Sequence, residues 1–185
     1  MQAPDLFHAR PRQLSRAEYD RMAQLGFFHG ERVELIHGIV VRMSPIGPPH
    51  SEVVDRLMAR LVRSLPTNAR VRVQQPFVAG GESEPEPDVA IVPERSYAPG
   101  HPSEASLIVE VAETSLTYDR ETKADLYGSS NVAEYWIVDV TGRRVLVHRH
   151  AVGGRYASVR EATSGDELRP AAFPDVVVSI RALFD

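Results

Sequence analysis

A single carboxylate interrupts the most apolar segment of this chain. Residues 107–112 read Leu-Ile-Val-Glu-Val-Ala, a run of β-branched and aliphatic residues that is typical of a buried strand. Side chains alternate across a strand, so Glu110 shares one face with Ile108 and Ala112, while only apolar residues occupy the other face. An unpaired buried carboxylate costs several kcal/mol or takes up a proton. We therefore expect a cation or a metal ion to accompany Glu110 in the folded protein.

The pattern around this strand predicts an α/β domain with a mixed sheet. A capping box at Ser15–Glu18 opens a helix that reaches about residue 25, and apolar residues recur at helical spacing from Val53 to Leu65. A third helix is expected at about 119–128. Strands are expected at 31–43, folded as a hairpin around His37-Gly38, and at 70–79, 87–92, 106–112, 134–139, 143–149, 154–160 and 175–180.

The composition is that of an ordinary globular domain, and it excludes several classes of protein. With 185 residues, the chain is expected to form one domain spanning 1–185. No segment has the roughly 18 apolar residues of a membrane span, no signal-peptide pattern is present, and the absence of cysteine excludes disulfides and thiolate zinc sites. These features predict a cytoplasmic protein without membrane contact. The net charge of −4 argues against a general nucleic-acid coat, but it is compatible with an enzyme that acts on DNA.

A second carboxylate opens the strand that precedes the Glu110 strand. Asp88 follows Pro87 and begins the apolar run Val89–Val92. An exposed strand end is an equally ordinary interpretation of Asp88 alone. If the two strands are neighbours, however, the carboxylates of Asp88 and Glu110 meet at one edge of the sheet. Hard oxygen ligands of this kind suit Mg²⁺ or Mn²⁺, with water and a substrate phosphate completing the coordination.

One lysine stands among twenty arginines in this sequence, and it lies in the predicted helix after the Glu110 strand. An ammonium is a compact charge with a tunable pKa, whereas a guanidinium is a wide planar fork that stays charged. We expect the ammonium of Lys123 to lie near Glu110, Asp88 or both and to remain protonated, because neighbouring carboxylates raise its pKa. The alternative is an ordinary helical ion pair between Lys123 and Asp119, four residues earlier.

Other polar residues have two interpretations at this stage. Glu34 lies between apolar neighbours in the first predicted hairpin, where a solvated strand face explains it, and His50 stands at the start of the long helix, where a capping role explains it. The arginines of the long helix recur opposite its apolar stripe; they suit a solvated face or a ridge that contacts phosphates. These arginines are Arg56, Arg60 and Arg63.

Six segments, in this order, resemble the Uma-type restriction endonuclease family of the PD-(D/E)XK nuclease superfamily. They are Val-Glu-Leu-Ile-His-Gly at 33–38, Met-Ser-Pro at 43–45 with His50, Glu-Pro-Asp-Val at 86–89, Leu-Ile-Val-Glu-Val at 107–111, Tyr118-Asp119 with Lys123 and Tyr127, and Glu-Tyr-Trp-Ile-Val-Asp at 134–139. The resemblance covers about 14–149. It implies a restriction-endonuclease-like mixed sheet flanked by helices, with additional N- and C-terminal strands and a C-terminal strand extension at 150–185.

The resemblance also implies roles for particular residues. Asp88 and Glu110 would bind the metal ion together with the carbonyl of Val111, and Glu34 would extend this metal site. His50 would orient water or contact the scissile phosphate. The superfamily's usual lysine lies two residues beyond the second acid, where this chain has Ala112, so the helix would supply Lys123 instead.

The activity implied by the resemblance is that of an endonuclease that hydrolyses phosphodiester bonds in DNA with Mg²⁺ or Mn²⁺ and acts as a homodimer. The alternative is a non-catalytic DNA-binding or protein-interaction module that uses the same fold, since a fold does not guarantee a function. A Lys123 side chain that points to solvent would favour the module.

Overall fold

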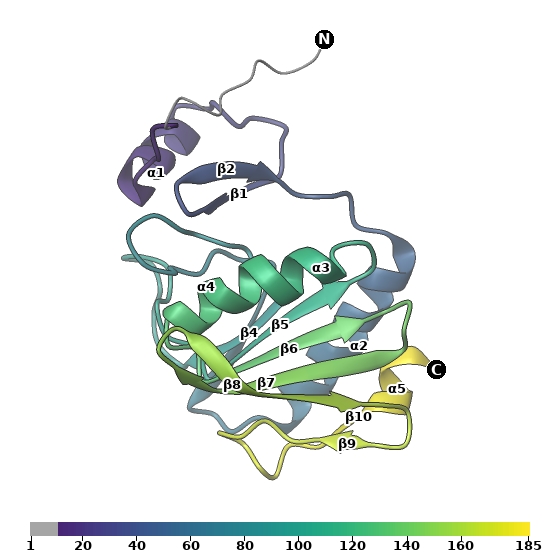
Figure 1. Ribbon diagram of the computed structural model, residues 1–185. Helices are drawn as coiled ribbons and strands as arrows, with labels where there is room; N and C mark the ends of the chain where they lie inside the picture. The colour runs from purple at the N-terminus through teal and green to yellow at the C-terminus, as the bar shows by residue number, and fades with distance from the viewer. Residues whose placement is uncertain (1–10) are drawn as a thin grey trace.

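Six strands form one mixed sheet with helices on both faces in the computed structural model, which describes residues 11–185 (Figure 1). The strand order is β3-β4-β5-β6-β7-β8, and only the β5–β6 pair is parallel. The strands of this sheet are β3 Ala69–Val73, β4 Val89–Pro93, β5 Leu107–Ala112, β6 Glu134–Asp139, β7 Arg144–Val152 and β8 Arg155–Ala162. A helical crossover joins the two parallel strands and consists of α3 Leu116–Tyr118, η1 Asp119–Lys123 and α4 Ala124–Ser129.

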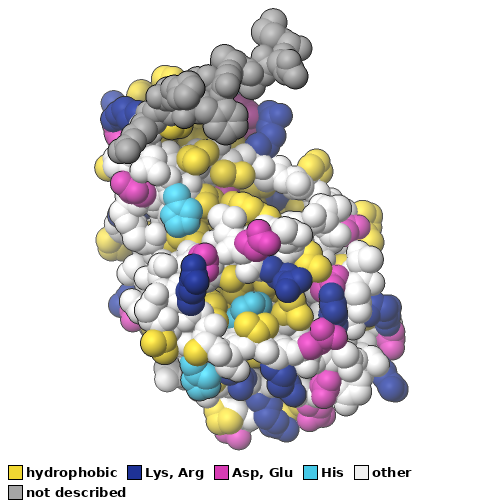
Figure 2. Space-filling model, in the orientation of Figure 1, with side chains coloured by type: hydrophobic (Ala, Val, Ile, Leu, Met, Phe, Trp, Pro, Cys, Tyr) yellow, Lys and Arg dark blue, Asp and Glu magenta, His cyan; other side chains and the backbone are white. Residues whose placement is uncertain are grey.

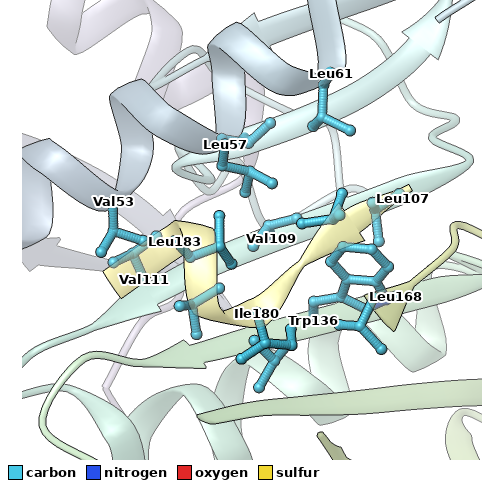
Figure 3. Close-up of a cluster of buried hydrophobic side chains, with 14 of the residues drawn as sticks. Val53, Leu57, Leu61, Leu107, Val109, Val111, Trp136, Leu168, Ile180 and Leu183 are labelled. Carbon is cyan, nitrogen blue, oxygen red and sulfur yellow. The ribbon is translucent and has the colours of Figure 1, made fainter. Parts of the chain in front are cut away.

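The alternation expected for residues 107–112 is confirmed by the packing on the two faces of the sheet. Leu107, Val109 and Val111 pack against α2 (Pro48–Ser64) and α5 (Ile180–Phe184), as Figure 3 shows. Ile108 and Ala112 belong to the cluster on the opposite face, beneath α3 and α4. Glu110 therefore lies on the face covered by the crossover helices.

An N-terminal block lies above one end of the sheet (Figure 1). It contains α1 (Arg16–Gln24), whose capping box forms as expected, and the hairpin of β1 (Val33–Ile36) and β2 (Ile39–Arg42). The hairpin turns at His37 and Gly38, which both have positive φ, as a tight two-residue turn requires. The hairpin is a separate two-stranded sheet, and a bridge between Leu35 and Glu84 connects it to the loop before β4.

Glu84 is a buried carboxylate in this connection, and its ionisation should weaken the fold. Burial raises the pKa of Glu84 to about 7, with Asp20 adding to the shift and Arg16 opposing it. The folded protein then holds a proton that the unfolded chain releases near pH 4.5, so stability falls as the pH rises from 4.5 to 7.

We expect Glu84→Gln to raise the free energy of unfolding at pH 8 by about 1 kcal/mol, after allowing for solvent screening. The difference from the wild type should vanish below pH 4.5, and urea unfolding across this range measures it. Glu82→Gln, at an exposed position of the same loop, is the matched control. An equal effect of both substitutions would contradict the burial argument.

Two expected strands differ from the structure. The strand expected at 70–79 ends at Val73, because Gln74 adopts a positive φ and Pro76 cannot donate to a ladder. The strand expected at 175–180 shrinks to β10 (Val178–Ser179), paired with β9 (Glu167–Leu168), and α5 begins at Ile180. Val176, Val178 and Ile180 are buried, as expected for a strand. The observed turn, short strand and helix bury the same residues, so burial alone did not distinguish the two structures.

Two further boundaries shift. The single helix expected at 119–128 is instead α3, the π-helical turn η1 and α4. β7 continues past residue 149 and pairs with β8, so the first part of the expected C-terminal extension belongs to the main sheet. No helix in the described part of the chain has the length and apolar character needed to cross a membrane.

Candidate active site

Asp88 and Glu110 meet where β4 and β5 separate. The ladder between these strands ends at the pair Val89 and Val109. Beyond it, the carboxylates replace the backbone pairing: the Asp88 N–H donates to Glu110 Oε2 at 3.3 Å, and the Val111 N–H donates to Asp88 Oδ2 at 2.8 Å. Both side chains are buried. The expected convergence of the two carboxylates at one end of the sheet is therefore present.

The ammonium of Lys123 lies between two buried carboxylates. Its Nζ donates to Glu34 Oε2 at 2.7 Å and to Glu110 Oε1 at 3.1 Å, and the residue is only 3% exposed. Burial lowers the pKa of Lys123, but Glu110 and Glu34 outweigh burial, so its pKa lies above the ordinary value and the ammonium stays charged. The alternative pairing with Asp119 is wrong, because Asp119 accepts a hydrogen bond from Ser115 and Lys123 pairs with the two glutamates.

The crossover helix presents a tyrosine beside this lysine. Tyr127 lies one helical turn after Lys123, and its hydroxyl donates to Glu110 Oε1 at 2.7 Å. In the sequence, Tyr127 is a landmark of the family resemblance, which implies no role for it. The spacing of four residues between the lysine and the tyrosine on one helix was the available signal.

Glu34 reaches the same cluster from the N-terminal hairpin. It is 3% exposed, and its Oε2 accepts from Lys123 and from the Glu86 N–H at 3.3 Å. The Tyr118 hydroxyl approaches Oε1 at 3.4 Å. The solvated-strand interpretation of Glu34 is therefore wrong, because docking of the hairpin buries the face that carries this side chain.

Asp88 has two further partners from opposite sides. His50, in the first turn of α2, places Nε2 at 3.0 Å from Asp88 Oδ2, and Gln74 donates its amide to Oδ1 at 3.2 Å. Burial lowers the pKa of His50, but the hydrogen bond and negative charge of Asp88 outweigh burial, so the pKa lies above its ordinary value. A capping role for His50 is not what the structure shows. The contact of Gln74 was missed, because an amide at a strand end gives no sequence signal.

Burial opposes the negative charge of Glu110, and its neighbours compensate part of this effect. Burial raises its pKa, Lys123 opposes this shift, and the negative charge of Asp88 adds to it. Its three hydrogen-bonding neighbours, the Lys123 ammonium, the Tyr127 hydroxyl and the Asp88 N–H, are all donors. They favour the ionised carboxylate. An additional cation beside Glu110 would stabilise this form further.

A cavity of about 580 Å³ is formed by the hairpin, the start of α2, the end of β5 and the crossover helix, and it is lined by Glu34, His50, Asp88, Glu110 and Lys123. Six carboxylates and three Lys or Arg side chains line it, so the wall carries three more formal negative than positive charges. The acids are Glu34, Glu86, Asp88, Glu110, Glu113 and Asp119, and the cations are Arg32, Arg42 and Lys123.

This donor set fits a hard divalent cation that keeps part of its water shell. Among residues 11–185, no group of three or more His, Cys, Asp and Glu side chains is close enough to hold a metal ion by itself. Mg²⁺, however, commonly binds through one or two carboxylates and completes its coordination with water and substrate phosphate. Asp88 and Glu110 supply such a pair, and the excess of negative charge favours the binding of a cation before a polyanion enters.

The arginines of α2 form no ridge beside this cavity. Arg56 pairs with Glu52 on its own helix, Arg60 donates to the carbonyl of Val177, and Arg63 is exposed. None of the three lines the cavity. Their solvated-face interpretation is therefore the one that agrees with the structure.

The arrangement of the sheet and its crossover is shared with another solved structure. A solved structure described as a putative nuclease belonging to DUF820 from Anabaena variabilis ATCC 29413 is similar to this chain, with a TM-score of 0.68 and 16% sequence identity. The similarity covers 83% of this chain and 90% of that chain. Among curated proteins, the sequence has no match.

The family follows from the sequence match along nearly the whole described chain. The model of the Uma2 family, whose description is "Putative restriction endonuclease", matches residues 16–181. The chain therefore belongs to the Uma2 family, as the six segments indicated. The match extends beyond residue 149 and includes β8, β9 and β10.

Proposed function

We propose that this protein is a metal-dependent endonuclease that hydrolyses phosphodiester bonds in DNA. One observation carries the proposal: Asp88, Glu110 and Lys123 come from a strand end, a strand and a helix, and all three are buried together at one cavity. Two adjacent carboxylates with a compact cation are the groups that hydrolysis of a phosphodiester with a divalent ion needs. Membership of a family described as restriction endonucleases supports the same activity.

The residues would divide the work as follows. Asp88 and Glu110, with the Val111 carbonyl, would hold Mg²⁺ or Mn²⁺, which when bound polarises a phosphate and lowers the pKa of an attacking water. Glu34, which pairs with Lys123 and is not close enough to complete a set of three acids, would add its negative charge to the metal site from beside it. Lys123 would place positive charge where negative charge grows in the transition state. His50 would support Asp88 and contact the phosphate or the water, since its Nε2 lies 3.0 Å from Asp88.

DNA as the substrate is compatible with the surface of the molecule. Figure 2 shows acidic and basic side chains interspersed on one face, without a continuous basic surface there. Broad electrostatic coating of DNA is therefore not expected from that face, and the bound cation would supply local attraction at the cavity. A homodimer in the cytoplasm completes the proposal. The outer edge of β8, with Val159 57% exposed, is a surface on which a second copy could pair.

The non-catalytic module is the second candidate, and the orientation of Lys123 counts against it. A Lys123 side chain that points to solvent would favour such a module. In this structure Lys123 points into the cluster and not to solvent. The enzyme is therefore the function that the geometry supports best.

Cleavage by carboxylate variants tests the proposal. We expect Asp88→Asn and Glu110→Gln to reduce Mg²⁺-dependent cleavage of DNA at least about a hundredfold, because each neutral amide loses a charged metal ligand. The rate is measured on labelled DNA with Mg²⁺, with Mn²⁺ and with EDTA. Asp125→Asn, on the exposed side of α4, is the matched control. Cleavage that persists in both variants, or in EDTA, would reject the metal site.

A further inference from the structure

Gln74 adopts a backbone conformation that residues other than glycine rarely occupy. β3 ends at Val73, and Gln74 follows with φ of 49°, in the left-handed region. Glycine and asparagine are the residues that tolerate this conformation best. A glutamine here stores backbone strain, and such strain persists where the surrounding structure holds the residue for a purpose.

Both the main chain and the side chain of Gln74 make hydrogen bonds at Asp88. The Gln74 N–H is shared between the carbonyls of Pro87 and Asp88, each at 3.1 Å. The side-chain amide donates to Asp88 Oδ1 at 3.2 Å. Rotation about the N–Cα bond sets the direction of Cβ, so the left-handed φ of Gln74 determines where its side chain begins. The strain and the side-chain contact with Asp88 therefore arise from one feature.

The two oxygens of Asp88 have unequal support. Oδ2 accepts from the Val111 N–H at 2.8 Å and lies 3.0 Å from His50 Nε2. Among the described residues, Oδ1 has one donor, the amide of Gln74. Without the Gln74 amide, Oδ1 of Asp88 has no donor among the described residues. The carboxylate is then free to rotate and weaken its hydrogen bond with the Val111 N–H. Hydrogen bonds of this kind, made to a ligand and not to the metal, orient the ligand and set its affinity.

We propose that Gln74 is a positioning residue that fixes the rotation of the Asp88 carboxylate. Its strained backbone is the means by which the amide reaches Oδ1. The inference rests on the proposed function in one respect, because it assumes that Asp88 is a metal ligand. Its structural part, the support of the bond between Asp88 and Val111, can be measured without metal.

The test compares Gln74→Gly with His37→Gly. Glycine relieves the backbone strain at both positions, because His37 has the same φ of 49°, and His37 is exposed in the hairpin turn. We expect Gln74→Gly to keep or raise the melting temperature while Mn²⁺ affinity, measured by calorimetry, falls about tenfold. We also expect hydrogen exchange at the Val111 amide of the metal-free protein to become about tenfold faster. His37→Gly should change neither Mn²⁺ affinity nor this exchange.

Gln74→Asn separates the amide from the backbone. Asparagine accepts the left-handed conformation, but its side chain is one methylene shorter, so we expect it to behave as Gln74→Gly does. Wild-type Mn²⁺ affinity and wild-type exchange at Val111 in Gln74→Gly would overturn the inference. So would a lower melting temperature with unchanged Mn²⁺ affinity, which would make Gln74 a residue of the fold alone.

The measurements distinguish this inference from the proposed function. If the wild type binds Mn²⁺ and cleaves no DNA, the proposed function fails, and the Mn²⁺ affinity of Gln74→Gly still decides the role of Gln74. If the wild type binds no Mn²⁺, exchange at the Val111 amide decides whether Gln74 holds Asp88.

Discussion

Replacing Lys123 with arginine should leave the protein folded and remove most of its Mg²⁺-dependent DNA cleavage. Arginine keeps a positive charge between Glu34 and Glu110, so the charge balance of the buried cluster survives. The planar guanidinium, however, is wider than an ammonium and spreads its donors over a fork. It cannot place a compact charge at the same point, 2.7 Å from one carboxylate and 3.1 Å from the other. We expect cleavage to fall at least about a hundredfold, the scale of losing one donor to a transition state.

Circular dichroism and cleavage rates with Mg²⁺ and Mn²⁺ measure this outcome. Arg120→Lys is the matched control, because it exchanges the same two side chains at an exposed position of η1. Cleavage at the wild-type rate by folded Lys123→Arg would end the catalytic role of Lys123. If the wild type itself cleaves no DNA with either metal, the interaction-module interpretation replaces the enzyme.

Removing the charge altogether should damage the fold. In Lys123→Met, Glu34 and Glu110 remain buried without their shared cation, and an uncompensated buried charge typically costs 3–5 kcal/mol, so we expect a loss of about 4 kcal/mol at pH 8. Without Lys123, the pKa of Glu110, already raised by burial, would rise further above that of the unfolded chain. The loss should therefore shrink as the pH falls and Glu110 takes up a proton. Urea unfolding at pH 8 and at pH 5 measures the effect.

A second substitution provides the control for this prediction. Glu34→Gln in the Lys123→Met background removes one of the two buried negative charges that have lost their cation, so it should recover part of the lost stability. Glu31→Gln, at an exposed position before the hairpin, should recover none. Equal stability of Lys123→Met and wild type at pH 8 would show that the lysine compensates no charge.

The site residues that could be predicted from the sequence are those whose type is unusual at their position. Glu110 is a charge within an apolar strand, and Lys123 is the one lysine in an arginine-rich chain. Both lie in the cluster, together with Asp88. Their catalytic roles stay predictions, because position does not measure activity. Gln74 contacts Asp88 and Tyr127 contacts Glu110, but nothing in the sequence near Gln74 is unusual, and Tyr127 is indicated only by its spacing from Lys123.

The fold was predictable where one periodicity dominated. The alternation of residues 107–112 and the helical spacing after Val53 predicted β5 and α2 close to their observed bounds. Prediction failed where backbone conformation or tertiary contact decided the outcome. The end of β3 depends on the left-handed Gln74, and the burial of Glu34 depends on docking of a hairpin that belongs to another sheet. The segment before α5 satisfies its apolar alternation without forming a long strand.

The ion pair between Lys123 and Glu34 joins elements that are 89 residues apart, and it ties the N-terminal hairpin to the main domain. The hairpin is not part of the six-stranded sheet, so its attachment depends on such contacts and on the bridge at Glu84. Attachment of the hairpin and occupancy of the cavity are therefore thermodynamically linked. A ligand that binds the attached form more tightly by some factor must favour attachment by the same factor. The fraction of molecules with the hairpin attached therefore changes when a ligand binds in the cavity.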